Sequence, residues 1–102
     1  MEMLTVTENE KEGVVTIAPH KRFDFGVHRE FRESYRDRKG STARYVIDMT
    51  DVEYIDSSAL GMLLLLREYA MANKGVVVIA DCKPEIRKIL AIANFDRLFE
   101  IK

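Results

Sequence analysis

The change from strand to helix occurs in one segment, Asp48-Met49-Thr50-Asp51-Val52-Glu53-Tyr54-Ile55-Asp56-Ser57-Ser58-Ala59-Leu60-Gly61. The residues before it, Tyr45-Val46-Ile47, predict a strand that ends at Asp48. Asp56-Ser57-Ser58 supplies the residue types that cap helices, and an apolar helix is expected to follow as far as Asn73. The run Ala59–Leu66 is much shorter than the about 20 apolar residues of a membrane span, so it predicts a buried helix segment.

Strands and helices are also expected on the N-terminal side of this segment. Met3–Thr7 and Val14–Ile17 are rich in β-branched residues and are separated by a polar loop that ends in Gly13, which predicts an antiparallel hairpin. Apolar residues at intervals of four then predict a helix, which Gly40-Ser41 is expected to end. That apolar stripe consists of Val27, Phe31 and Tyr35.

The C-terminal side continues the alternation. Gly75 is expected to stop the long helix, and Val76–Ile79 predicts a strand buried on both faces. Pro84 suits the first turn of a third helix, and Leu98–Ile101 predicts a last strand. The apolar face of that third helix is expected to consist of Ile86, Ile89, Leu90 and Ala93.

The order of these elements predicts an α/β fold. Strands that alternate with helices pair in parallel, so we expect a mixed, mostly parallel β-sheet, antiparallel only at its N-terminal hairpin, with three main helices. A chain of 102 residues fits a single domain over residues 1–102. Sites in such sheets lie outside the carboxyl ends of the strands, here Ala18–Gly26, Asp48–Ser58 and Ala80–Pro84.

Composition excludes several classes of function. Lys and Arg total 16 and Asp and Glu total 17, a net charge of −1, which argues against nucleic-acid binding through bulk charge. Cys82 is the one cysteine, so no intrachain disulfide can form, and one cysteine is too few to complete a Cys/His zinc site with the two histidines. The phosphate-binding glycine loops are missing from the sequence, and His20 and His28 have no recognisable Ser and Asp partners. We therefore expect a soluble cytoplasmic protein that is not an enzyme, needs no cofactor and has no membrane span.

Ser57 and Ser58 stand at the expected helix start, where backbone N–H groups are unpaired and the helix dipole is positive. A phosphate added to either serine would be stabilised there and would change the charge of the surface. The alternative is that one of the two serines is an ordinary N-cap, a common role for this residue type.

The wider pattern resembles the STAS domain, and more narrowly the bacterial anti-anti-sigma factors (anti-sigma factor antagonists). The resemblance rests on Asp56-Ser57-Ser58-Ala59-Leu60-Gly61 after an apolar strand and a short acidic link, and it extends over nearly the whole chain. It implies that Ser57 is phosphorylated by a partner kinase that is also the anti-sigma factor, and that Asp24 in Lys21-Arg22-Phe23-Asp24 contacts that kinase. Ala59 and Lys21 stand where the family usually has glycine.

The resemblance also implies the partners. These are an anti-sigma factor of the GHKL-type serine kinase class, bound by the unphosphorylated protein, and a PP2C-type phosphatase that resets the switch. The residues expected to contact the partner around Ser57 are Asp24, Asp56, Ser58, Ala59 and Met62. The alternative is a STAS subunit of a larger complex, for lipid transport or of the stressosome type, without a phosphorylation switch.

Two charged features have alternative interpretations. The segment from Lys21 to Arg44 has eight basic and four acidic residues, which suits either an acidic partner or, as we favour, a solvated helix surface. Asp48, Asp51 and Asp56 could hold Mg²⁺ as in a phosphorylatable receiver domain, but Pro19-His20 stands where such a domain has its acidic pair. Asp48 is instead expected to shape the exit from its strand.

Overall fold

The computed structural model describes residues 3–36 and 42–102. Within these ranges the chain alternates between strands and helices, as expected. The strands are β1 (Leu4–Asn9), β2 (Val14–Pro19), β3 (Lys21–Phe23), β4 (Arg44–Asp48), β5 (Val52–Ile55), β6 (Val76–Ala80) and β7 (Glu100–Ile101). The helices are α1 (His28–Tyr35), α2 (Ser57–Ala72) and α3 (Pro84–Ile92), together with the short 3₁₀ helices η1 (Phe25–Val27) and η2 (Phe95–Arg97).

The main sheet has the strand order β1-β2-β4-β6-β7. Strand β1 runs antiparallel to β2, and every other pair in this sheet is parallel. The predicted α/β fold, with a mostly parallel sheet, an antiparallel N-terminal hairpin and three helices, is therefore confirmed. A second, two-stranded parallel sheet joins β3 to β5, and the sequence pattern did not predict it.

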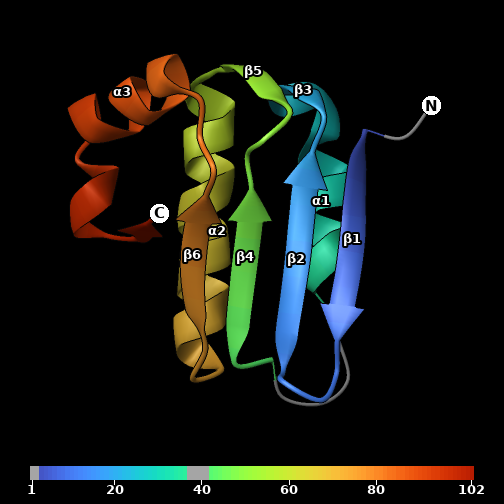
Figure 1. Cartoon of the computed structure of the whole chain (residues 1–102). Helices are drawn as coiled ribbons and strands as arrows, with labels where there is room; N and C mark the ends of the chain where they lie inside the picture. Colours follow the sequence, from blue (N-terminus) through green and yellow to red (C-terminus); the bar gives the residue numbers. More distant parts are fainter. Residues whose placement is uncertain (1–2, 37–41) are drawn as a thin grey trace.

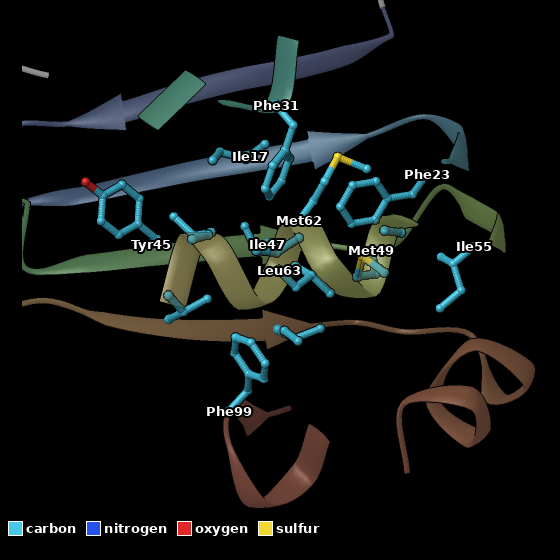
Figure 2. Packing of buried hydrophobic residues seen from close by; sticks show 14 of the residues in the cluster. Ile17, Phe23, Phe31, Tyr45, Ile47, Met49, Ile55, Met62, Leu63 and Phe99 are labelled. Atoms are coloured by element: carbon cyan, nitrogen blue, oxygen red, sulfur yellow. The ribbon is translucent and has the colours of Figure 1, made fainter. Parts of the chain in front are cut away.

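Helices α1 and α2 lie against one face of the main sheet (Figure 1). Alternate residues of the central strands point to this face because side chains alternate along a strand. Figure 2 shows Ile17 of β2 and Ile47 of β4 packed with Leu63 of α2, and all three side chains are buried. The apolar stripe of α1 packs against the same cluster, since Val27, Phe31 and Tyr35 are buried as predicted.

Helix α2 is apolar on both sides, and only one side is covered. Leu63 and Leu66 are buried, whereas Leu64 is exposed and Leu65 is 58% exposed. The expectation that the whole run Ala59–Leu66 is buried is therefore wrong. The physical reason is that a helix turns about 100° per residue, so a continuous apolar run must present part of itself to solvent when a sheet covers one side only.

The turn after α2 differs in detail from the prediction. The left-handed residue is Lys74, with φ of 62°, and not Gly75. The N–H of Gly75 donates to the carbonyl oxygen of Ala70 at 2.7 Å, which closes the helix. A glycine is required at position 75 for another reason: a Cβ there would lie 2.8 Å from the carbonyl oxygen of Thr42.

Further expectations need correction. Val76, in the strand that was expected to be buried on both faces, is exposed, and the last strand begins at Glu100 and not at Leu98. In α3, Ile86 and Leu90 are buried, but Ile89 is exposed because it lies on the outer side of the helix. Helix α1 ends at Tyr35, and Gly40-Ser41, which were expected to end it, lie outside the described residues. Arg38 and Lys39 of the basic segment also lie outside them.

Candidate functional site

The small sheet of β3 and β5 brings together two segments that are far apart in the sequence. Arg22 pairs with Tyr54 and Phe23 pairs with Ile55 in the parallel register. Phe23 and Ile55 are buried in the core, while Arg22 and Tyr54 face solvent. Because each strand ends after its buried residue, the next residues, Asp24 and Asp56, leave the two strands at the same level.

Helix α2 starts with a cap made by Asp56. The backbone of Asp56 is extended, with φ of −121° and ψ of −177°, and its Oδ1 accepts from the N–H of Ala59 at 3.0 Å. Neither serine is the N-cap, so that alternative is wrong. Ser57 is exposed and Ser58 is half-buried in the first turn. A group added to the Ser57 hydroxyl would therefore leave the cap of α2 in place.

Asp24 plays the same capping role for the loop that follows β3. Its Oδ1 accepts from the N–H of Gly26 at 2.9 Å, which starts η1. Its Oδ2 accepts from Nε of Arg22 at 3.1 Å. The guanidinium of Arg22 also lies 4.2 Å from the centre of the Tyr54 ring, a cation–π contact. Asp24 is thus fixed both to its own loop and, through Arg22, to β5.

Phe25 stands out beside this loop. Its ring is 62% exposed and stacks on the His28 ring, with the centroids 4.3 Å apart and the planes at 11°. The Nδ1 atom of His28 is hydrogen-bonded to the carbonyl oxygen of Phe25 at 3.0 Å, so the two rings are held in place. An exposed aromatic ring held in this way is accessible to another protein, and aromatic residues are enriched at protein interfaces.

The structure separates the expected partner contacts into two groups. Asp24, Asp56 and Ser58 lie with Ser57 around the ends of β3 and β5. Ala59 is 0% exposed and Met62 is 8% exposed, and both belong to the core cluster. The expectation that these two side chains contact a partner is therefore not compatible with their burial, because the inner side of α2 faces the sheet.

Sequence reasoning did not identify Arg22, Tyr54 and Phe25 as residues of this surface. The signal that could have found them was the pairing of β3 with β5. Both strands are too short for a clear periodic pattern, and the register alone places Arg22 over Tyr54.

His20 has partners that the sequence did not reveal. Its Nε2 lies 2.7 Å from Oγ1 of Thr5, and its Nδ1 lies 3.4 Å from Oδ2 of Asp51. The sequence pattern did not predict these two contacts of His20. The side chain of Asp51 is largely exposed, and the three residues come from β1, the β2–β3 connection and the turn before β5. They tie these segments together at the base of the small sheet.

Asp48 shapes the exit from β4, as expected. Its Oδ1 accepts from the N–H of Thr50 at 3.0 Å and from the Thr50 hydroxyl at 2.6 Å. In the two described ranges, no three His, Cys, Asp or Glu side chains are grouped closely enough to hold a metal ion. The geometry therefore gives the Mg²⁺ interpretation of Asp48, Asp51 and Asp56 no support.

A cavity of about 460 Å³ opens beside the Asp24 loop. Its wall is formed by Met3, His20, Lys21, Arg22, Asp24, Gly26 and Val27. The cavity makes the surface next to Asp24 concave, whereas Phe25 makes the neighbouring surface convex.

Among the described helices, none is both long and apolar enough to cross a bilayer.

Comparisons with known proteins agree with this architecture. The family model for the STAS domain matches residues 5–102. A STAS-domain containing protein of Pseudomonas aeruginosa strain UCBPP-PA14 is 51% identical over 87 residues, which is 85% of this chain and 86% of the relative.

Solved structures give the same fold at low sequence identity. An anti-sigma-factor antagonist (STAS) domain protein from Planctomyces limnophilus superposes with a TM-score of 0.80 at 18% identity, covering 96% of this chain and 87% of that one. The anti-sigma factor antagonist SpoIIAA in its unphosphorylated form gives 0.76 at 16% identity, with coverage of 97% and 86%. SpoIIAA of Bacillus in its phosphorylated form gives 0.68 at 14% identity, with coverage of 97% and 90%. At these identities the likeness establishes the fold.

Proposed function

The chain belongs to the STAS domain family, and from this premise we propose that it is an anti-sigma factor antagonist switched by phosphorylation of Ser57. As a single domain over residues 1–102, it binds an anti-sigma factor of the serine kinase class when Ser57 carries its hydroxyl. Phosphorylation releases the partner, and a phosphatase of the PP2C class restores binding. The kinase supplies ATP and Mg²⁺, while this chain acts by binding alone in the cytoplasm.

The observation that carries the proposal is the exposed Ser57 hydroxyl at the start of a helix that Asp56 caps. A kinase can reach an exposed hydroxyl without unfolding the segment. The added phosphate carries about −1.5 to −2 charges at neutral pH and lies beside the positive end of the α2 dipole. The modification therefore changes the surface and leaves the fold intact. The phosphorylated form of SpoIIAA, a protein of the same fold, supports this interpretation.

The outer side of α2 supports a protein partner. Gly61, Leu64, Leu65 and Met71 are all exposed on this helix and follow Ser57 at helical spacing. No neighbouring atom would lie within 4 Å of a Cβ at Gly61, so another chain can approach closely there. A mostly apolar stripe that begins at Ser57 supports the proposal of a docking surface with the charge change at its edge.

The test uses three variants and, as the proposed partner, a GHKL-type serine kinase from the same organism. We expect Ser57→Ala to keep kinase binding and to lose phosphate incorporation, measured by intact mass. Ser57→Asp is expected to weaken binding by at least tenfold, about 1.4 kcal/mol, measured by titration calorimetry. Thr7→Ala is the matched control, because it removes an exposed hydroxyl in the middle of β1, away from the start of α2, and is expected to change neither result.

Two outcomes would contradict the proposal. Full labelling of Ser57→Ala would show that the switch lies elsewhere. A stoichiometric complex that survives Ser57→Asp without loss of affinity would favour the alternative, a STAS subunit of a larger assembly.

A further inference from the structure

The solvent face of the β3–β5 sheet carries a small set of charges next to Ser57. Arg22 and Tyr54 face outward from one register pair, and Asp24 and Asp56 follow the next pair. The buried side of the same sheet is formed by Phe23 and Ile55. The set therefore contains two carboxylates, one guanidinium and one aromatic ring, and the next residue along the chain after Asp56 is Ser57.

The position of the Arg22 head group is defined by two contacts. Its Nε donates to Oδ2 of Asp24 at 3.1 Å, and its Cζ lies 4.2 Å from the centre of the Tyr54 ring. Because Asp24 follows the last residue of β3, the first contact holds the guanidinium near the ends of β3 and β5. The second places it over β5, the strand that leads into α2. Three residues of extended chain span about 10 Å, so the backbone of Ser57 lies at most about 10 Å from that of Tyr54.

Arg22 is also able to exchange its partner. Its side chain is 65% exposed, and that of Asp24 is 22% exposed. An exposed ion pair of this kind is worth about 1 kcal/mol or less, so little opposes the exchange. Asp24 keeps its hydrogen bond from Gly26 when Arg22 leaves, because that bond uses the other carboxylate oxygen.

A phosphate on Ser57 is a stronger partner for Arg22 than Asp24 is. It carries up to twice the charge and has three acceptor oxygens, which match the fork of a guanidinium. Asp56 is not available to balance the phosphate, because it is itself negative and accepts from the N–H of Ala59. The guanidinium can keep its contact with the Tyr54 ring while it moves from the Asp24 carboxylate to the phosphate.

We propose that Arg22 is the residue that senses the state of Ser57: on phosphorylation its guanidinium leaves Asp24 and binds the phosphate. This inference rests on the proposed function, since it assumes that Ser57 is the modified residue. Its consequence is that one modification changes the surface at two places. Phosphate appears at the start of α2, and the Asp24 carboxylate in the loop after β3 loses its counter-charge.

The test needs no kinase. Phosphoserine is incorporated at position 57 during translation, and the phosphate is titrated by ³¹P NMR in the full chain. A bound guanidinium favours the dianion, so we expect its second pKa to be lower by about 1 unit with Arg22 than in Arg22→Gln. Arg44→Gln is the matched control, because Arg44 is exposed at the opposite end of β4 and is expected to leave the titration unchanged.

The amide signal of Gly26 gives a second readout, since its N–H donates to Asp24. It is expected to shift on phosphorylation of the wild-type chain and to shift much less in the phosphorylated Arg22→Gln chain. Arg22→Lys keeps the charge but not the fork and is expected to fall between the two. Equal titrations for the wild-type and Arg22→Gln chains would overturn the proposal, and a raised pKa in Lys21→Gln alone would assign the role to Lys21. A failure here leaves the kinase experiment on Ser57 unaffected, so the two hypotheses are tested separately.

Discussion

Gly75 shows at the scale of one residue how closely the chain is packed at the end of α2. Its missing side chain allows the carbonyl oxygen of Thr42 to approach a position where a Cβ would lie 2.8 Å away. We expect Gly75→Ala to lower the free energy of unfolding by about 1–3 kcal/mol, because backbone must move to relieve the overlap. Urea denaturation followed by circular dichroism measures this.

Gly61 provides the matched control for that substitution. It lies in the exposed side of α2, and no atom lies within 4 Å of a Cβ built there. Alanine favours helix over glycine, so Gly61→Ala is expected to raise the free energy of unfolding by about 0.5–1 kcal/mol. Equal effects of the two substitutions would contradict the packing described for Gly75.

Individual residues also show what the sequence could reveal. Ser57 and Asp24 were predicted as site residues because each lies in a short local motif, and the cap at Asp56 follows from residue type. Arg22 and Tyr54 could not be predicted in this way, since their contact depends on the pairing of two strands. The two residues are 32 positions apart in the sequence. Contacts across a sheet depend on register, which no local pattern specifies for strands of three and four residues.

Single elements can be tested at their ends, and the N-terminus of α2 is the clearest case. Asp56 caps the helix through its carboxylate, which accepts from the N–H of Ala59. Asp56→Ala is expected to reduce the free energy of unfolding by about 1 kcal/mol, while Asp56→Asn retains most of the stability because asparagine caps equally well. Thermal melts of the unphosphorylated protein distinguish the two. An Asp56→Asn chain as unstable as Asp56→Ala would show that the charge, and not the cap, matters.

Strands and helices that are long and have a clear apolar period were predicted more accurately than short ones. The strands of the main sheet and the three helices were expected close to where they lie, because apolar periodicity and helix-ending residues are local properties. The prediction failed for the outer sides of helices. Leu65 and Ile89 are apolar and exposed, and an apolar residue type alone does not reveal which side the sheet covers.

At the scale of the whole molecule, stability depends on pH through the half-buried Cys82 and the buried Tyr35, both among the residues that the structure describes. Burial raises the pKa of the Cys82 thiol, an effect that Arg87 opposes and Asp81 reinforces. Burial likewise raises the pKa of Tyr35, against the opposing charges of Arg36 and Arg32. In both cases the folded state holds the proton more tightly than the unfolded state. The stability from each group is fully present below its unfolded pKa and is lost as pH rises through its folded pKa.

We therefore expect the free energy of unfolding to fall in the alkaline range, and the fall to begin at higher pH in Cys82→Ala, because the fall from each group begins near its ordinary pKa and that of a thiol is the lower of the two. Urea denaturation at a series of pH values measures this in wild-type and variant chains. Identical alkaline profiles for the two would show that the thiol does not contribute. Absorbance at 240 nm, which follows thiolate formation in the folded protein, provides an independent check.

The path of the first strand has a practical consequence. Met3 forms part of the wall of the cavity beside Asp24, and the N–H of His20 donates to its carbonyl oxygen. Figure 1 shows that β1 begins at the end of the sheet where β3 lies and that the C-terminal end of the chain lies beside β6. A tag joined on the N-terminal side of Met3 would start at the wall of that cavity and is expected to hinder sterically any molecule that binds there. Fusions and fluorescent labels for interaction assays therefore belong after Lys102.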